Sequence, residues 1–214
     1  MQPTALALAP ALWPERVSRA LQVVLLVLAG TALLTVSAKV KVWQEPVPIT
    51  LQTLAVMLIS AAYGSRLAVA TVLAYLLEGA LGLPVFTNTP PMIAGPAYFL
   101  GTTGGFLVGF IPLAFIVGYA ADRGWDRSAV KLFGAMVAAD IVVFAIGLAW
   151  LAWGTPLSPG LAKLLGAAAG THGTGIAFAW AKGVAPFVVA DLLKIALAAA
   201  LVPASWALIA PRRN

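Results

Sequence analysis

The chain has no cysteine and only one histidine among its 214 residues. Without cysteine it can form neither a disulfide bond nor a thiolate metal site. Charged residues are also scarce, at 9% of the sequence, whereas hydrophobic residues make up 62%. A soluble globular protein usually has about 25% charged residues. The composition therefore indicates a polytopic helical membrane protein that resides in a lipid bilayer.

Sequence motifs of common enzyme classes are missing as well. There is no GxxxxGK(S/T) phosphate-binding loop and no HExxH zinc motif, which argues against ATP hydrolysis and zinc proteolysis by this chain. His172 lies in a glycine-rich segment and is interpreted as a loop residue. The net charge of +6 comes from basic residues scattered around apolar segments, a distribution typical of membrane topology. We therefore expect no catalytic residue, metal, cofactor or nucleic-acid partner.

Six apolar segments predict an all-α membrane domain over residues 17–209, with cytoplasmic tails at 1–16 and 210–214. The predicted transmembrane helices are 17–37, 50–63, 67–81, 106–121, 129–153 and 183–209. The second spans only roughly 21 Å, less than the hydrocarbon core of about 30 Å. Before it, Pro46 and Pro48 disfavour a helix and predict extended backbone. We expect this proline-rich extended segment, after the first helix, to complete the crossing.

Two long connections are expected to carry structure of their own. The connection 82–103 has no charged residue but contains several aromatic ones. A connection of this length and composition is expected to pack onto the domain as a lid. The connection 154–182 is rich in small residues and is expected to include a short interfacial helix.

Basic residues are distributed unequally between alternate connections. Eight Lys and Arg residues lie in the N-terminal tail, the link 64–66, the turn 122–131 and the C-terminus, and four lie in the other connections. The positive-inside rule then predicts that both termini are cytoplasmic. The three long connections, 38–49, 82–103 and 154–182, are accordingly expected on the outside.

Asp191 and Lys194 are two ionisable residues within the last apolar segment. At about 100° per residue, positions three apart lie on nearly the same helix face, so the two side chains can contact each other and a shared ligand. Charge at membrane depth costs at least a few kcal/mol, and such residues usually face a cavity or a protein interior. The two charged residues can be interpreted either as part of a ligand site or as a structural ion pair. We expect Asp191 about eight residues, or roughly 12 Å, into its helix.

Glu78 and Asp140 are the other acids within predicted helices. Glu78 lies near the outer end of its helix. The sequence is equally compatible with two roles for it, an ion pair with a lysine of an outer connection or a part in a ligand site. Asp140 lies near the middle of its helix. There a buried structural partner is favoured, although a proton relay would need the same kind of residue.

Four motifs follow one another along the chain. They are AKVKVWQEPVPITLQTLAVML at 38–58, EGALGLPVF at 78–86, GTTGGFLVGF at 101–110 and DLLK at 191–194. In these motifs the chain resembles the BioY family, the biotin-specific substrate-binding (S) components of energy-coupling-factor (ECF) transporters. The resemblance implies a six-helix, multi-pass protein of the cytoplasmic (inner) membrane. It would capture biotin outside and release it inside, without chemistry of its own.

The resemblance also implies site residues. In the family, the aspartate and lysine of the last helix contact biotin, and they correspond to Asp191 and Lys194. Gln52 in the first motif and Asn88 after the second are further implied contacts. After the second motif the chain reads TNTPP at 87–91, in place of the family's glycine-rich continuation. Aromatic residues expected to form apolar walls around the ligand are Trp43, Phe86, Tyr98 and Phe99.

The chemistry of these residues leaves the orientation of biotin open. An aspartate can accept a hydrogen bond from a ureido N–H group. A lysine can donate to the ureido carbonyl or pair with the carboxylate, so either end of biotin suits Lys194.

The implied partners are a shared transmembrane subunit and ATPase subunits. S components dock to the transmembrane subunit through small residues on the first helix, often in an AxxxA pattern. The segment 17–37 has Ala29, Gly30 and Ala32 but no AxxxA. An alternative is a carrier that works alone or as a homo-oligomer without ATPase partners, or one that is coupled to protons or ions through Asp140, Glu78 and Asp191. An intramembrane enzyme is a third hypothesis, which turnover of biotin derivatives would support.

Overall fold

The computed structural model describes residues 18–42, 47–91, 94–154 and 175–209. Within these ranges it has six helices: α2 (Arg19–Lys39), α3 (Gln52–Ala80), α4 (Gly104–Asp122), α5 (Ala129–Trp153), α7 (Ile176–Gly183) and α8 (Val188–Ile209). Shorter elements are the strands β1 (Lys41–Val42) and β2 (Ile49–Thr50) and the 3-10 helices η1 (Pro96–Leu100) and η2 (Trp125–Arg127). The fold is thus all-helical apart from one pair of two-residue strands.

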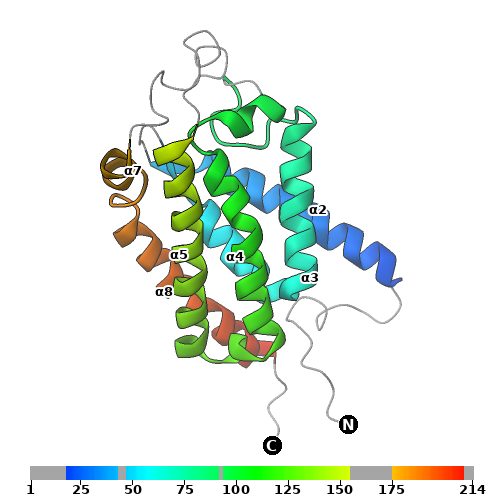
Figure 1. Ribbon diagram of the computed structural model, residues 1–214. Helices are drawn as coiled ribbons and strands as arrows, with labels where there is room; N and C mark the ends of the chain where they lie inside the picture. The colour runs from blue at the N-terminus through cyan, green and yellow to red at the C-terminus, as the bar shows by residue number, and fades with distance from the viewer. Residues whose placement is uncertain (1–17, 43–46, 92–93, 155–174, 210–214) are drawn as a thin grey trace, which may run out of the picture.

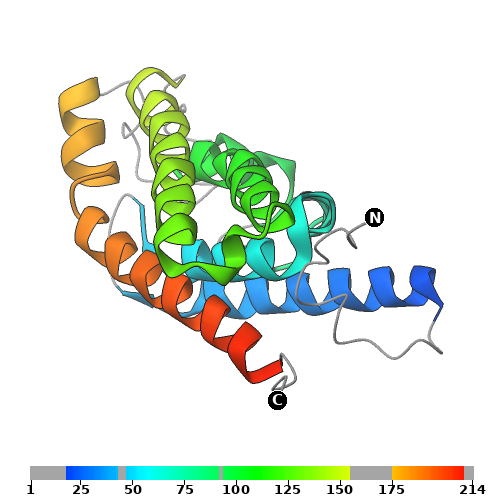
Figure 2. The same cartoon turned by 90° about the horizontal axis from the view of Figure 1, so that it is seen from below.

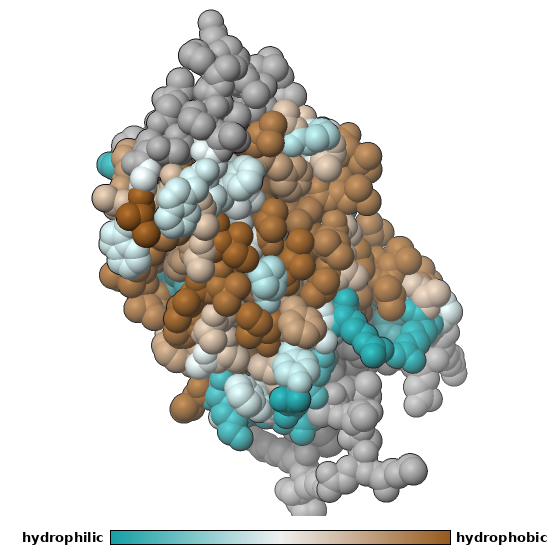
Figure 3. All heavy atoms as spheres, in the orientation of Figure 1, coloured by the Kyte–Doolittle hydropathy of each residue, from teal (hydrophilic) through white to brown (hydrophobic). Residues whose placement is uncertain are grey.

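Five of these helices, α2, α3, α4, α5 and α8, are long and apolar enough to cross a membrane. Helix α4 packs between α3 and α5, whereas α2 and α8 are inclined against them at the periphery (Figures 1 and 2). A broad apolar belt covers the middle of the molecule, and hydrophilic residues gather at its lower end (Figure 3). Lipid tolerates such a surface because each helix satisfies its own backbone hydrogen bonds. The prediction of a multi-pass helical membrane protein is confirmed.

The predicted helices 50–63 and 67–81 are the two arms of α3, which turns sharply at Gly64 (Figure 1). Gly64 has φ 76° and ψ 171°, a conformation that is strained for any residue with a Cβ atom. Beside it, the backbone N–H of Ser65 donates to Asp122 Oδ2 at 3.1 Å. A Cβ atom on Gly118 would lie 2.6 Å from the Ser65 backbone. The expected three-residue link is therefore a one-residue bend packed against the end of α4.

Two short strands lie in the segment between α2 and α3. Strand β1 pairs antiparallel with β2, with Lys41 opposite Thr50 and Val42 opposite Ile49. The backbone N–H of Leu51 also donates to the Val40 carbonyl at 3.1 Å. This pairing returns the chain to the end of α2, so that the first arm of α3 begins close to where α2 ends.

The last predicted helix, 183–209, starts five residues before the helix in the structure. Helix α7 ends at Gly183, and α8 begins at Val188. Between them lies Pro186, which has no backbone N–H and disfavours continuation of a helix. Asp191 therefore lies in the first turn of α8, and the expected depth of eight residues was wrong. Helix α7 itself supplies a short helix within the connection 154–182, of which residues 155–174 lie outside the described ranges.

Glycines let α4 and α5 approach closely. A Cβ atom on Gly105 would lie 2.3 Å from Trp150 Cβ, and one on Gly109 would lie 3.1 Å from Val143 Cα. Neither space could hold an alanine without a shift of the neighbouring helix. This contact brings Val143 and Phe144 of α5 to the wall of the cavity described next.

Candidate ligand-binding site

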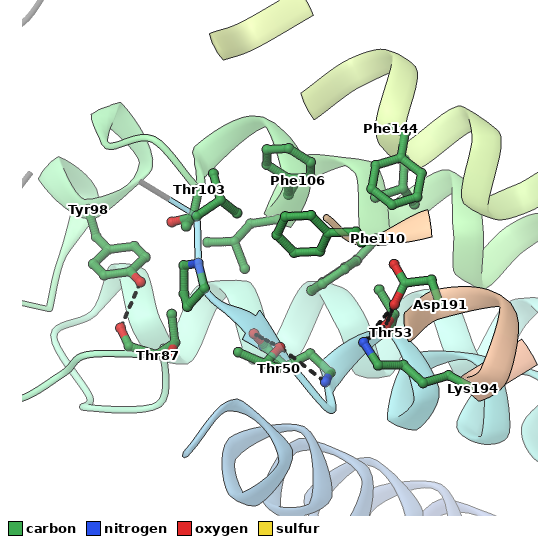
Figure 4. A pocket seen from close by; sticks show the side chains of 16 residues that line it. Thr50, Thr53, Thr87, Tyr98, Thr103, Phe106, Phe110, Phe144, Asp191 and Lys194 are labelled. Carbon is green, nitrogen blue, oxygen red and sulfur yellow. Dashed lines mark hydrogen bonds and ion pairs between the residues drawn. The ribbon is translucent and has the colours of Figure 1, made fainter. Parts of the chain in front are cut away.

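A cavity lies among α3, α4, α5 and α8, bordered by η1 and β2 (Figure 4). Small-molecule sites commonly have apolar walls and a few polar groups that fix the orientation of the ligand. The residues that line it are Val47, Pro48, Thr50, Gln52, Thr53, Thr87, Tyr98, Thr103, Phe106, Leu107, Phe110, Val143, Phe144, Phe187, Asp191 and Lys194. The cavity thus has the composition of a ligand site.

Asp191 and Lys194 form an ion pair at one end of the cavity. Lys194 Nζ lies 2.6 Å from Asp191 Oδ1, as their spacing of three residues on one helix predicts. Thr53 of α3 bridges them, because its hydroxyl donates to Asp191 Oδ1 at 3.0 Å and accepts from Lys194 Nζ at 3.1 Å. Both charged residues are buried, with exposures of 1% and 9%. The arrangement ties α8 to α3 and keeps the two charges paired.

The second oxygen of Asp191 is a free acceptor. Asp191 Oδ2 is buried and has no hydrogen-bond partner among the described residues. Buried polar atoms in proteins are nearly always hydrogen-bonded, so an exception requires an explanation. Since Asp191 lines the cavity, a donor on a bound ligand would satisfy this oxygen.

Gln52 also lines the cavity, but the protein itself holds part of its amide. Its Nε2 donates to Tyr75 Oη at 2.8 Å, and Tyr75 in turn donates to the Val85 carbonyl at 3.0 Å. The Thr50 hydroxyl approaches Gln52 Oε1 at 3.4 Å. Gln52 thereby connects the start of α3 to the loop after α3.

Tyr98 lies at the far end of the cavity from the ion pair (Figure 4). Its hydroxyl donates to the Thr87 carbonyl at 2.7 Å. Burial raises the pKa of the Tyr98 phenol to about 12, although a hydrogen bond with Thr103 offsets part of the rise. The phenol therefore stays protonated, and thus remains a donor, at physiological pH. Its ring stacks on Phe86, with the two centroids 4.7 Å apart.

Phe86 and Asn88 are not among the residues that line the cavity. Phe86 is fully buried behind Tyr98, and its ring also meets Tyr75 edge-on at 5.4 Å. The Asn88 side chain accepts a hydrogen bond from Lys41. The ligand contacts predicted at these two positions stay predictions, and so does that of Trp43, which lies outside the described residues.

Four phenylalanines form an aromatic wall that the sequence analysis did not identify: Phe106, Phe110, Phe144 and Phe187. The rings of Phe106 and Phe187 are 6.4 Å apart, and those of Phe144 and Phe187 are 6.1 Å apart. They come from α4, α5 and the turn before α8, so only the fold unites them. Thr53 was missed as well, although it directly follows Gln52 in the first motif.

Asp140 and Glu78, the other acids within predicted helices, do not line this cavity. Asp140 is buried on α5 close to the charges of Asp191 and Lys194, and its Oδ1 has no hydrogen-bond partner among the described residues. It lines a separate groove between α5, α7 and α8, and Phe144 lines both spaces. Glu78 is half-buried and forms no ion pair within the described ranges.

Comparison with known proteins identifies relatives of this chain. The family model described as the BioY family matches residues 11–211. A probable biotin transporter BioY of Pyrococcus horikoshii is 34% identical over 173 residues, which cover 81% of this chain and 89% of that protein. The biotin transporter BioY of Rhodobacter capsulatus is 38% identical over 157 residues, which cover 70% and 73% of the two chains.

A solved structure has a similar fold. It is the crystal structure at 2.1 Å of the S-component for biotin from an ECF-type ABC transporter. The TM-score is 0.66 at 20% sequence identity, over 87% of this chain and 91% of that chain. At this identity the likeness establishes a common fold. Since the family model covers nearly the whole sequence, the chain belongs to the BioY family.

Proposed function

We propose that this protein binds biotin at the outer side of the membrane and delivers it to the cytoplasm as the substrate-specificity subunit of an ECF-type transporter. The observation that carries the proposal is the Asp191–Lys194 pair on the wall of an otherwise largely apolar cavity. Relatives are named biotin transporters, which supports the choice of ligand. The protein is no enzyme, and partner subunits perform any ATP hydrolysis.

The charged end of the cavity suits the ureido ring of biotin. Asp191 Oδ2 has no donor among the residues that the structure describes, and a ureido N–H group is a donor. Lys194 carries three N–H donors, of which two go to Asp191 and Thr53. The third can reach the ureido carbonyl, so an acceptor and a donor lie side by side as a ureide requires. A carboxylate placed at this end would instead be repelled by Asp191.

The middle of the cavity suits the apolar part of biotin. The phenylalanine wall together with Leu107 and Val143 can enclose the thiophane ring and the aliphatic chain. Burial of apolar surface contributes roughly 25 cal/mol per Å². The apolar wall supplies affinity in this arrangement, whereas the polar groups fix the orientation of the ligand.

The outward orientation is supported by the distribution of charge over the fold. The bend at Gly64 meets the end of α4 through the Ser65–Asp122 hydrogen bond, and η2 follows α4 directly. The basic residues of the bend, of η2 and of the turns beside it therefore lie at one end of the bundle. Those residues are Arg66, Arg123, Arg127 and Lys131. The cavity lies toward the opposite end, with the start of α3 and the connection 82–103. By the positive-inside rule, the basic end is cytoplasmic. Both termini are then cytoplasmic, and the two arms of α3 make six crossings in all.

Direct binding tests the proposal. Isothermal titration of the purified protein in lipid nanodiscs should give one biotin per chain. Asp191→Asn keeps the shape of the side chain but removes its charge, and Lys194→Met removes the donor. Because hydrogen bonds to charged groups contribute about 1.5–3 kcal/mol, each change should weaken binding roughly tenfold or more.

Lys182→Met is the matched control, since Lys182 is exposed on α7. This variant should bind biotin as the unmodified protein does. Unchanged affinity in both site variants would rule out the assigned site. A titration of the unmodified protein without any biotin binding would rule out the function itself.

A second candidate function, an ion-coupled carrier, rests on Asp140. Its Oδ1 is buried, lies near Asp191 and Lys194 and has no partner among the described residues, so the carboxyl group could exchange a proton during transport. Biotin uptake into proteoliposomes that contain this protein alone, with an imposed pH gradient, distinguishes the two functions. Uptake driven by the gradient and abolished by Asp140→Asn would favour the carrier. No uptake without ECF partners would favour the S component.

A further inference from the structure

The cavity has a second polar end that the proposed ligand contacts leave unused. Asp191, Lys194 and Thr53 lie at one end, and Thr87 and Tyr98 lie at the other, with the phenylalanine wall between them (Figure 4). A ligand that fills the cavity therefore meets polar groups at both of its ends.

The Thr87 hydroxyl is the free group at this second end. Thr87 is 5% exposed, and its Oγ1 has no hydrogen-bond partner among the described residues. The neighbouring Tyr98 hydroxyl does not satisfy it, because its proton goes to the Thr87 carbonyl. A buried hydroxyl without a partner is unfavourable, since it has lost its hydrogen bonds to water. A partner supplied by a ligand would restore that loss.

The turn around Thr87, residues 85–89, is fixed by surrounding side chains. Tyr75 Oη donates to the Val85 carbonyl at 3.0 Å, and Lys39 Nζ donates to the Phe86 carbonyl at 2.6 Å. Further contacts from side chains to this turn are Tyr98 to the Thr87 carbonyl, Lys41 to Asn88 and Lys39 to Thr89. Thr87 is therefore held at the wall of the cavity before any ligand arrives, and little freedom is lost on binding.

We propose that Thr87 is a specificity-determining residue that donates a hydrogen bond to the carboxylate of the ligand. The assignment rests on the proposed function and extends it. If Asp191 and Lys194 bind the ureido ring, the carboxylate of biotin extends toward the other end. Among the described residues that line the cavity, the only cation is Lys194, at the ureido end. Recognition of the carboxylate by this part of the chain thus falls to neutral donors, of which the Thr87 hydroxyl is the one without a partner.

Two substitutions at this position separate the hydroxyl from the shape of the side chain. Thr87→Val keeps the branched shape but removes the donor, whereas Thr87→Ser keeps the donor. In titrations with biotin, Thr87→Val should weaken binding about tenfold, equivalent to about 1.4 kcal/mol. Thr87→Ser should stay within about threefold of the unmodified protein, because a hydroxyl remains available as donor. Affinity for biotin that is equal in the Val variant and the unmodified protein would overturn the proposal.

Thr71→Val is the matched control. Thr71 is buried on α3, does not line the cavity, and its hydroxyl already donates to the Leu67 carbonyl at 2.8 Å. It should bind biotin as the unmodified protein does. If Thr87→Val does not yield folded protein, as judged by thermal unfolding, Thr87→Ala removes the same donor and replaces it in the comparison.

A second ligand identifies the end of biotin that Thr87 contacts. Biotinol has an alcohol in place of the carboxylate, and hydrogen bonds to a charged acceptor are roughly twice as strong as neutral ones. The ratio of affinities between the unmodified protein and Thr87→Val should fall from about tenfold for biotin to about threefold or less for biotinol. An equal ratio for both ligands would refute a contact with the carboxylate. A lack of biotin binding by the unmodified protein would instead count against the proposed function.

Discussion

Thr53 of α3 hydrogen-bonds to both charged side chains of the cavity, which lie on α8. Its one hydroxyl serves Asp191 as a donor and Lys194 as an acceptor. A structural ion pair and a ligand site were both compatible with the sequence, and the geometry allows one pair of residues to serve as both. Pairing with Lys194 stabilises Asp191 Oδ1 in the membrane, while Oδ2 stays available to a ligand.

Thr53→Val should weaken biotin binding without abolishing it. The change removes two hydrogen bonds that orient Asp191 and Lys194, and a typical net contribution is about 1 kcal/mol per bond. We expect titration to show a loss of affinity of roughly five- to thirtyfold. Thr53→Ser, which retains the hydroxyl, should recover most of it. A purely structural role would lower the thermal midpoint of Thr53→Val but leave the affinity of the folded protein unchanged.

At the scale of elements, α3 owes its shape to one residue. Gly64 adopts φ 76° and ψ 171°, and its bend lets the first arm line the cavity while the second arm packs on α4. The turn is fixed further by the contact of Ser65 with Asp122. A straight helix of 29 residues would carry Gln52 and Thr53 away from α8.

Gly64→Ala should destabilise the protein because the Cβ atom makes this backbone conformation unfavourable. Strain of this kind costs about 1–3 kcal/mol, so the midpoint of thermal unfolding in detergent should fall by several degrees. Gly134→Ala is the control, since Gly134 lies in α5 with open space around it. There alanine should be neutral or stabilising by up to about 1 kcal/mol, because it favours a helix. Equal midpoints for the two variants would contradict a bend that depends on glycine.

Helix α2 is hydrogen-bonded to the turn at 85–89 through its last residue. Lys39, the last residue of α2, contacts the Phe86 carbonyl and Thr89. Most of the other large side chains of α2 are exposed, and its buried face packs on α3. A displacement of α2 would therefore either break the contacts of Lys39 or move the turn that carries Thr87.

At the scale of the whole molecule, the absence of cysteine makes the predicted topology directly testable. Leu83→Cys lies in the connection 82–103 at the end nearest the cavity, and Ser128→Cys lies between η2 and α5 at the basic end. A membrane-impermeant maleimide added to intact cells should label Leu83→Cys and spare Ser128→Cys. In inside-out vesicles the pattern should reverse. The opposite pattern would place the cavity on the cytoplasmic side.

Much of the fold could be predicted from the sequence because it depends on local properties. Apolar length locates the helices, and the limits 129–153 of α5 agree with the prediction. The spacing of three residues on one helix was sufficient to pair Asp191 with Lys194. The bend at Gly64 is narrower than the expected link because contacts with α4 fix it. Helix α8 begins later than expected because Pro186 disfavours a helix.

The composition of the site was decided only by the tertiary structure. The sequence by itself determined a membrane protein with a charged pair in its last helix, since burial in lipid and helical periodicity act over a few neighbouring residues. Contacts between distant segments determine the rest. Thr53 meets Asp191 across 138 positions, and four phenylalanines from three parts of the chain form one wall. The free hydroxyl of Thr87 is recognised only when every nearby donor and acceptor has been assigned a partner, and those partners come from α2, α3 and η1.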